Sequence, residues 1–203
     1  MQIAVSGVES DSTMLHVEAF PPRVTYADLE QWPEDGRRYE IYDGEVFVVP
    51  APLPVHQVVA LNVADLLKDY QQHHGGLVLP SPIDIVFSQH DVVEPDVIFF
   101  EARRRHLIDL EAVIRVAPDL AVEVLSPSTR ATDRGKKMQM FARYGVREYW
   151  LVDPKAHTVE VRWLNGDRYV LAQTAAGADW VRSTILPDLT FQAETIFPDP
   201  SGH

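Results

Sequence analysis

Hydrophobic and polar positions along the first third of the chain alternate with the periods of both strands and helices. Two β-rich runs, residues 38–42 and 45–49, flank Asp43-Gly44, and a two-residue Asp-Gly loop between such runs is a strong hairpin signal. Thr25 is the expected N-cap of a short helix over residues 26–31, which Pro33 ends. Apolar residues then recur at helical spacing over residues 56–73, and this pattern predicts a long helix with one buried face.

The remainder of the chain mixes both periods. Asp133 is the expected cap of a helix over residues 134–144, which Gly145 ends, and a short helix is expected over residues 107–113. Strands are predicted over residues 77–79, 83–87, 92–100, 120–125, 148–152, 158–164 and 168–172. This order predicts an α/β fold, with a mixed central β-sheet flanked by α-helices and additional β-hairpins. We expect an N-terminal extension over residues 1–20, a single domain over 21–198 and a C-terminal tail over 199–203.

Composition excludes several classes of site. The chain has no cysteine, so structural disulfides, thiolate zinc sites and cysteine nucleophiles are excluded, and this absence fits a cytoplasmic protein. No apolar run approaches the length of a membrane span, so we expect no membrane partner. The net charge of −12 argues against a general nucleic-acid coating protein. It argues less against a nuclease, because a metal-dependent site collects carboxylates whose charge the metal reverses.

Two acidic residues lie within or at the start of apolar strands, where carboxylates are uncommon. Glu123 lies in the middle of an apolar strand, where an ionised carboxylate is costly unless it is paired or coordinated. A buried ion pair explains Glu123 alone about as well as a functional role does. Asp96 follows Pro95 and opens another apolar run; taken singly, it is more often a turn or capping residue. Two such carboxylates on neighbouring strands would hold Mg²⁺, which prefers oxygen ligands.

A lysine lies on the helix that follows the strand of Glu123. Lys137 shares one helix face with Met140, Phe141 and Tyr144, at i, i+3, i+4 and i+7, and this otherwise apolar face should point at the sheet. A lysine directed inward near two carboxylates can steady an attacking hydroxide or a phosphoryl group. The simpler alternative is an Asp133–Lys137 pair along the helix, worth only a few tenths of a kcal/mol.

Other polar residues are weaker candidates. Glu40, on the first hairpin, could be an additional ligand or position a metal-bound water, and a structural role is nearly as well supported. His56 is more simply a helix-start residue, although it could contact a phosphate or act as a proton shuttle. Arg130 and Arg134 belong to a basic cluster near Lys137 and are candidate substrate-binding residues. The cluster over residues 103–105 is better explained as a solvated surface.

Several strings in this chain occur together in one known family. They are residues 39–45, His56, residues 94–97, residues 123–129, Asp133-Arg134 with Lys137, and residues 145–154. From about Thr25 to Phe197 the chain thereby resembles the putative restriction endonuclease family often called Uma-type, within the PD-(D/E)XK nuclease superfamily.

The resemblance implies a restriction-endonuclease-like fold, Mg²⁺ or Mn²⁺ as cofactor, and DNA as substrate. Carried over, Asp96 matches the superfamily's "PD" aspartate and Glu123 its second acidic residue, with Asp96, Glu123 and Val124 as the metal set. The motif lysine would stand two residues after Glu123, where this chain has Leu125, and Lys137 takes its place. The expected catalytic residues are Glu40, Asp96, Glu123 and Lys137.

Three functions are compatible with these residues. The leading hypothesis is a metal-dependent DNA endonuclease, which requires Asp96, Glu123 and Lys137 to converge on one cavity. A catalytically inactive nuclease-fold module for protein or nucleic-acid binding is favoured slightly by the acidic charge, and a hydrolase of a smaller phosphate ester is the third reading. The fold analogy also favours a homodimer, since nucleases often cut two strands with two subunits and the C-terminal hairpins offer an apolar edge.

Overall fold

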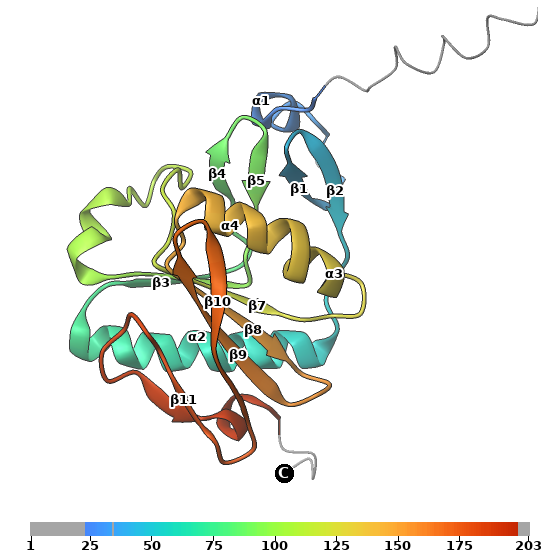
Figure 1. Ribbon diagram of the computed structural model, residues 1–203. Coiled ribbons are helices and arrows are strands. Elements are labelled where there is room, and N and C mark those ends of the chain that lie inside the picture. Colours follow the sequence, from blue (N-terminus) through green and yellow to red (C-terminus); the bar gives the residue numbers. More distant parts are fainter. Residues whose placement is uncertain (1–22, 34, 199–203) are drawn as a thin grey trace, which may run out of the picture.

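The computed structural model describes residues 23–33 and 35–198 (Figure 1). The predicted N-terminal extension over residues 1–20 and the tail over 199–203 lie outside the described residues. The helical elements are α1 (Tyr26–Leu29), α2 (Pro54–His74), the 3₁₀ segment η1 (Ala102–Leu107), α3 (Arg130–Thr132), the π-helical turn η2 (Asp133–Lys137), α4 (Met138–Tyr144) and the 3₁₀ segment η3 (Ala193–Ile196). The strands are β1 (Arg38–Tyr42), β2 (Glu45–Val49), β3 (Leu77–Pro80), β4 (Ile85–Ser88), β5 (Asp91–Val93), β6 (Val97–Phe100), β7 (Leu120–Val124), β8 (Glu148–Asp153), β9 (Thr158–Asn165), β10 (Arg168–Ala176), β11 (Trp180–Arg182) and β12 (Thr190–Gln192).

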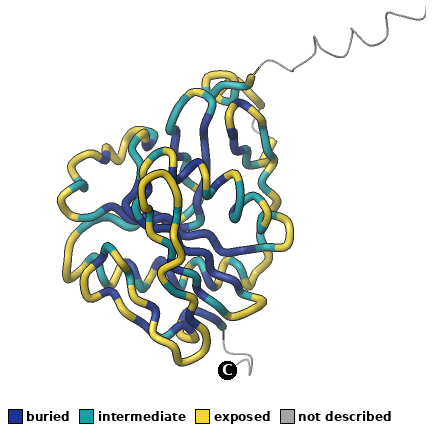
Figure 2. Tube along the Cα trace, viewed as in Figure 1, coloured by how far each residue is buried: buried dark blue, intermediate teal, exposed yellow. Residues whose placement is uncertain are grey.

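A six-stranded sheet in the order β10-β9-β8-β7-β6-β3 forms the centre of the molecule. Strands β7 and β8 run parallel, and the segment α3–η2–α4 connects them, while the other neighbouring strands are antiparallel. Helix α2 covers one face of this sheet and α4 the other (Figure 1). The central strands are buried along their whole length because both faces are covered (Figure 2).

Side chains of β6 and β7 alternate between two hydrophobic clusters. Val97 and Val122 pack in the cluster that contains α2, whereas Ile98 and Ala121 pack in the cluster that contains α4. Because the side-chain period of a strand is two, residue 123 shares the α4 face with Ala121. The strand register therefore directs Glu123 toward the helix that carries the predicted lysine.

A second sheet, in the order β2-β1-β5-β4, adjoins the central one. The predicted hairpin over residues 38–49 is present, with Arg38 opposite Val49 and Tyr42 opposite Glu45. Its two-residue loop has φ of 51° at Asp43 and 83° at Gly44, as a type I′ turn requires. This hairpin carries Glu40 on β1, and the chain leaving β2 leads directly to the start of α2.

Three sequence-based expectations were wrong in detail. Asp133 is not a helix cap, because the helical segment begins at α3, after Thr129, and Asp133 opens the π-helical turn inside it. The helix expected over residues 107–113 is instead the 3₁₀ segment η1, which ends at Leu107. The basic cluster over residues 103–105 is not wholly solvated, since Arg104 lies 2.9 Å from the fully buried carboxylate of Asp119. For Arg104, the contact with a residue distant in sequence is what local propensity could not reveal.

The predicted fold class is confirmed: a mixed central sheet is flanked by helices, with additional hairpins. In the described part of the chain, none of the helices combines the length and the apolar character needed to cross a bilayer. The cytoplasmic location stays a prediction.

Candidate active site

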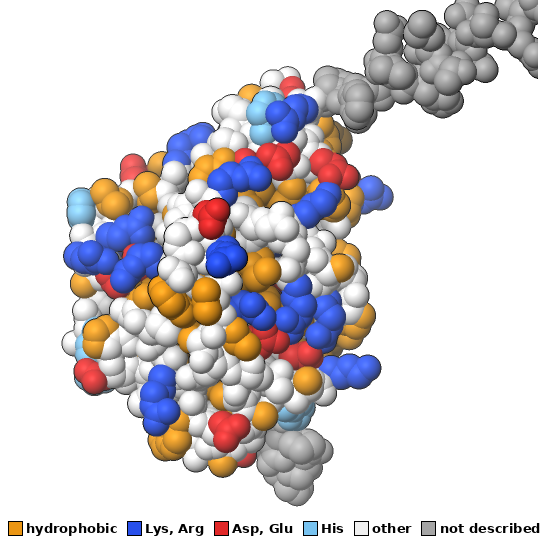
Figure 3. Space-filling model, in the orientation of Figure 1, with side chains coloured by type: hydrophobic (Ala, Val, Ile, Leu, Met, Phe, Trp, Pro, Cys, Tyr) orange, Lys and Arg blue, Asp and Glu red, His pale blue; other side chains and the backbone are white. Residues whose placement is uncertain are grey.

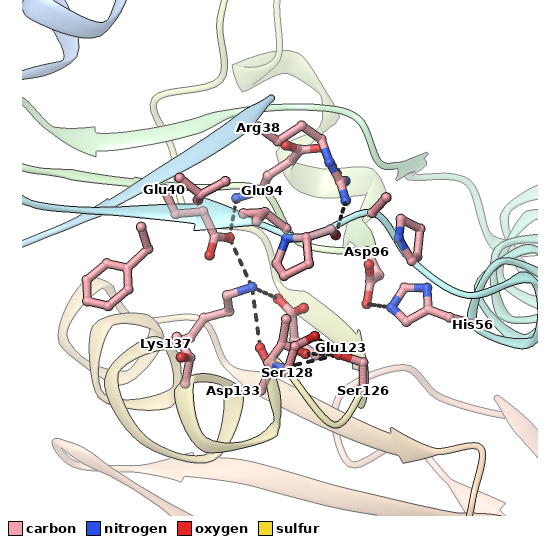
Figure 4. A pocket seen from close by; sticks show the side chains of 18 of the residues that line it. Arg38, Glu40, His56, Glu94, Asp96, Glu123, Ser126, Ser128, Asp133 and Lys137 are labelled. Carbon is pink, nitrogen blue, oxygen red and sulfur yellow. Dashed lines mark hydrogen bonds and ion pairs between the residues drawn. The ribbon is translucent and has the colours of Figure 1, made fainter. Parts of the chain in front are cut away.

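A cleft of about 380 Å³ opens where the two sheets meet the start of α2 and the segment α3–η2 (Figure 4). Five of the predicted site residues line it: Glu40, His56, Asp96, Glu123 and Lys137. They come from β1, α2, the residue before β6, β7 and η2, so elements far apart in the sequence form one site. The structure thus brings the three residues of the leading hypothesis to one cavity.

Asp96 and Glu123 are neighbours through strand register. Val97 of β6 lies opposite Val122 of antiparallel β7, so the residues just beyond this pair, Asp96 and Glu123, face each other at the end of the two strands. The main-chain N–H of Val124 donates a 2.7 Å hydrogen bond to Asp96 Oδ2. His56 Nε2 lies 3.2 Å from the same oxygen (Figure 4), so both contacts of the carboxylate involve Oδ2. Among the described residues, the second oxygen, Oδ1, has no hydrogen bond or ion pair.

Glu123 is deeply buried, with 3% of its surface exposed. Burial raises the pKa of Glu123 well above its ordinary value; Lys137 opposes this shift, and the nearby Asp96 carboxylate adds to it. Lys137 Nζ lies 3.1 Å from Glu123 Oε1, yet that oxygen has no well-aligned hydrogen bond among the described residues. The Glu123 carboxylate therefore has too few hydrogen bonds to offset the free-energy cost of burying its charge.

Lys137 projects from η2 into a set of three carboxylates (Figure 4). Its ammonium lies 3.0 Å from Glu40 Oε1, 3.1 Å from Glu123 Oε1 and 3.5 Å from Asp133 Oδ1. Burial alone would lower the pKa of Lys137, but the carboxylates of Glu123 and Glu40 raise it well above its usual value. An ammonium has three N–H donors, and here three carboxylates surround it. Lys137 is a charged group held in place, with no freedom to reach elsewhere.

Glu40 is held by the protein on both oxygens. Its Oε2 accepts a 2.6 Å hydrogen bond from the Tyr42 hydroxyl, and its Oε1 accepts a 3.0 Å hydrogen bond from the main-chain N–H of Glu94. Oε1 also contacts Lys137. Because these partners use both oxygens, Glu40 is better placed to position Lys137 than to bind a metal ion.

Asp133 belongs to the site, although its sequence position indicated only a cap and a helix partner of Lys137. Its side chain is buried in the cleft wall, and neither carboxylate oxygen has a hydrogen bond among the described residues. Burial raises the pKa of Asp133, with Lys137 opposing the shift. The signal in the sequence was its i, i+4 spacing to Lys137, which could have placed it beside the predicted cluster.

Buried carboxylates in the cleft outnumber the ammonium that faces them. Glu40, Glu123 and Asp133 surround Lys137, and Asp96 adds a further negative charge near Glu123. Such an excess of buried negative charge is costly unless protons or a further cation neutralise it. No three His, Asp or Glu side chains of the described residues are spaced to hold a metal by themselves. Mg²⁺ needs fewer side chains, since one or two carboxylates with several waters suffice. The pair Asp96 and Glu123 fits that requirement.

The two arginines expected to bind substrate lie outside the cleft lining. Arg130 Nη2 is 2.7 Å from Asp153 Oδ2, and Arg134 forms an ion pair with Glu160. The view in Figure 3 shows basic side chains lying beside acidic ones over this part of the molecule. Hydroxyls missed by the sequence analysis do line the cleft: Ser126, Ser128, Thr129 and Thr132.

Comparisons with known proteins agree with this architecture. A crystal structure of a putative nuclease belonging to DUF820, from Anabaena variabilis, is similar with a TM-score of 0.72 at 19% sequence identity, covering 86% of this chain and 97% of that one. The uncharacterized protein slr1290 of Synechocystis sp. is 26% identical over 150 residues, which are 72% of this chain and 77% of that protein. The sequence model of the family Uma2 matches residues 26–194, and the chain therefore belongs to this family, described as "Putative restriction endonuclease".

Proposed function

We propose that this protein is a metal-dependent endonuclease that hydrolyses phosphodiester bonds of DNA. The observation that carries the proposal is the convergence of Asp96, Glu123 and Lys137 in one buried cleft with an excess of negative charge. Membership of the family described as "Putative restriction endonuclease" supports the same reaction class.

Within this proposal, the metal ligands are the carboxylates of Asp96 and Glu123 and the main-chain carbonyl of Val124, because valine has no ligating side chain. A bound Mg²⁺ or Mn²⁺ would supply an activated water and neutralise charge on the phosphate. His56 and the Val124 N–H hold Asp96 through Oδ2, so Oδ1 would be the oxygen that binds the metal. These contacts of Asp96 would hold its carboxylate in one orientation for metal binding.

Lys137 is the proposed electrostatic partner of the phosphate or of the attacking water. Glu40 is a positioning residue, because it is anchored by Tyr42 and Glu94 and in turn holds the ammonium. Asp133 holds the same ammonium from its own helical segment. These two carboxylates retain Lys137 in the cleft, where its fixed charge can stabilise developing negative charge.

The test is cleavage of supercoiled plasmid and of single-stranded DNA with Mg²⁺, Mn²⁺ or EDTA. Glu123→Gln and Lys137→Met should abolish metal-dependent cleavage. The matched controls are Glu148→Gln, a buried carboxylate on β8 outside the cleft, and Lys136→Met, the half-exposed lysine next in sequence. Cleavage that survives in Glu123→Gln, or no cleavage by the unmodified protein under any of these conditions, would reject the proposal.

A non-catalytic module for nucleic-acid or protein binding is the second candidate. Its supporting observation is that Arg130 and Arg134, the arginines expected to bind substrate, are already paired with carboxylates. A protein of this kind would bind neither Mg²⁺ nor Mn²⁺ in calorimetry, whereas the nuclease must bind at least one of them.

We also propose a homodimer formed through the C-terminal hairpins. Trp163 of β9 and Leu171 of β10 are exposed apolar side chains on this part of the sheet, and β10 is its edge strand. Light scattering that gives the mass of one chain at high protein concentration would contradict this assembly.

A further inference from the structure

The walls of the cleft differ in chemistry, and this difference bears on which form of DNA can enter. One wall is apolar and follows the end of β2 and the chain leading to α2: Phe47, Val48, Val49, Pro50, Ala51, Pro52 and Leu53. The other wall carries four hydroxyl side chains, at Ser126, Ser128, Thr129 and Thr132. Hydroxyls are common sequence-independent contacts of phosphate oxygens, whereas apolar side chains pack on the faces of bases.

The edge of the apolar wall is exposed rather than packed into the core. Val48 is 52% exposed and Leu53 60% exposed, although both are large hydrophobic residues. Leu53 stands between Pro52 and Pro54, so its backbone has little freedom, and it is the N-cap residue of α2. We call Val48, Pro50, Pro52 and Leu53 the apolar lip of the cleft. Further exposed apolar side chains lie on the first turns of α2, at Val55, Val58 and Leu61.

The reacting groups lie at the bottom of a recess. Glu123 and Lys137 are 3% and 4% exposed, and the whole cleft holds about 380 Å³. That volume is near the lower end of the range for small-ligand pockets. To reach Glu123 and Lys137, a phosphate group must therefore enter this recess. A flexible unpaired strand can bend to place a phosphate there more easily than a stiff base-paired duplex can.

Charge around the cleft gives little attraction for the two phosphate rows of a duplex. Arg38, the arginine that lines the cleft, is 2.9 Å from Glu94, and Lys137 is enclosed by carboxylates. Affinity for duplex DNA depends strongly on free cations that neutralise phosphates. Contacts to bases must then contribute a larger share of binding, and bases are accessible to an apolar lip only where they are unpaired.

We propose that DNA enters this cleft as an unpaired strand, with bases packed on the apolar lip and phosphates along the hydroxyl wall. The proposal rests on the proposed nuclease function and adds its substrate class. The lip is continuous with the candidate active site, so a strand lying on it leads one phosphate to Asp96 and Glu123.

The experiment measures binding by fluorescence anisotropy, in Ca²⁺, of one labelled oligonucleotide as a single strand and as a blunt duplex. The single strand should bind about tenfold more tightly than the duplex, as base packing contributes to strand binding. Leu53→Ser should weaken strand binding by roughly fivefold, because it removes apolar contact area. Serine is also a favourable N-cap, so this variant keeps α2.

Leu110→Ser is the matched control, because Leu110 is 62% exposed and lies outside the cleft lining. It should leave strand binding unchanged. Equal or tighter binding of the duplex, absence of binding to either form, or equal effects of the two leucine variants would overturn the inference.

Cleavage with Mg²⁺, measured in parallel, separates the two proposals. A single strand that binds through Leu53 and is not cut would reject the nuclease function and keep the preference for binding an unpaired strand. A duplex cut faster than the strand would keep the nuclease and reject the preference. With cleavage present, Leu53→Ser should raise KM for the strand and leave kcat unchanged, since it changes binding and not the reacting groups.

Discussion

Replacing Glu123 by glutamine should stabilise the metal-free protein while it abolishes metal-dependent cleavage. Glu123 is buried near the carboxylates of Asp96, Asp133 and Glu40. The ammonium of Lys137 is shared by Glu123, Glu40 and Asp133. Glutamine keeps the shape of the side chain and removes one negative charge. The raised pKa of Glu123 means that the folded protein favours the neutral form, so the neutral amide suits the metal-free cleft better than the carboxylate does.

The magnitude follows from proton linkage. A carboxyl whose folded pKa exceeds its unfolded pKa stabilises the fold fully below the unfolded value, and this contribution is lost as pH rises through the folded value. Each unit of that difference corresponds to about 1.4 kcal/mol. Glutamine has no proton to lose, so at about pH 7 we expect Glu123→Gln to be the more stable protein. Because an unfolded glutamate has a pKa of about 4.3, the gain at that pH cannot exceed roughly 3.7 kcal/mol. Below about pH 4 the carboxyl is protonated in both states, and the difference should vanish.

The assay is urea unfolding in EDTA at several pH values, followed by the same series in Mg²⁺. Magnesium at about ten times its dissociation constant should stabilise the unmodified protein by roughly 1.4 kcal/mol and leave Glu123→Gln unchanged. Glu160→Gln is a control, because Glu160 is a partly buried carboxylate on β9 that pairs with Arg134 and Arg162. The pKa of Glu160 is lowered by these arginines despite its burial, so this control should destabilise the protein near neutral pH.

A Glu123→Gln protein that is less stable than the unmodified one in EDTA near neutral pH would contradict this expectation. Such a result would mean that the ion pair with Lys137 outweighs the burial of excess negative charge, and that the cleft does not need a further cation. A stability gain that persists unchanged at acid pH would also contradict the argument, because it could not arise from titration of Glu123.

Three further predictions concern the surroundings of Glu123. Lys137→Met should destabilise the protein by about 3–5 kcal/mol in urea unfolding, because it leaves buried carboxylates without their cation; a loss below that of Lys136→Met would contradict this. Asp96→Asn should remove Mg²⁺ binding in calorimetry without unfolding the protein, and undiminished binding would exclude Asp96 as a ligand. Glu148→Gln should cost roughly 1.5–3 kcal/mol, since this carboxylate accepts hydrogen bonds from Trp150 and Ser183. The Glu148→Gln variant should cleave DNA as fast per folded molecule as the unmodified protein does. A loss of activity as large as that of Glu123→Gln would mean that Glu148 on β8 takes part in the reaction.

Much of the site could be predicted from the sequence because local patterns placed its carboxylates. The apolar run around Glu123 predicted a buried strand, and Pro95 before an apolar run placed Asp96 at the start of the next one; both elements are present as β7 and β6. The Asp-Gly turn determined the register of the hairpin that carries Glu40. These features depend on neighbours within a few residues, which a sequence displays directly.

Contacts between distant segments could not be predicted in the same way. The i, i+4 spacing of Asp133 and Lys137 was visible, but the π-helical turn that holds them was not, because it depends on packing against the sheet. Arg104 resembled a solvated charge until the fold placed the buried Asp119 beside it. The apolar lip was likewise hidden, since exposure of Val48 and Leu53 is a property of the assembled cleft.

The position of the lysine on η2 has a physical consequence for the cleft. Leu125, two residues after Glu123, is buried in the hydrophobic cluster beneath α4, so that strand position contributes packing instead of charge. The ammonium comes from the facing helix, where Asp133 one turn earlier adds a third carboxylate to its contacts. A lysine supplied this way is fixed only while the helix stays docked on the sheet. Cleavage should therefore be lost together with the docking of α4, even where Asp96 keeps its place before β6 and Glu123 its place on β7.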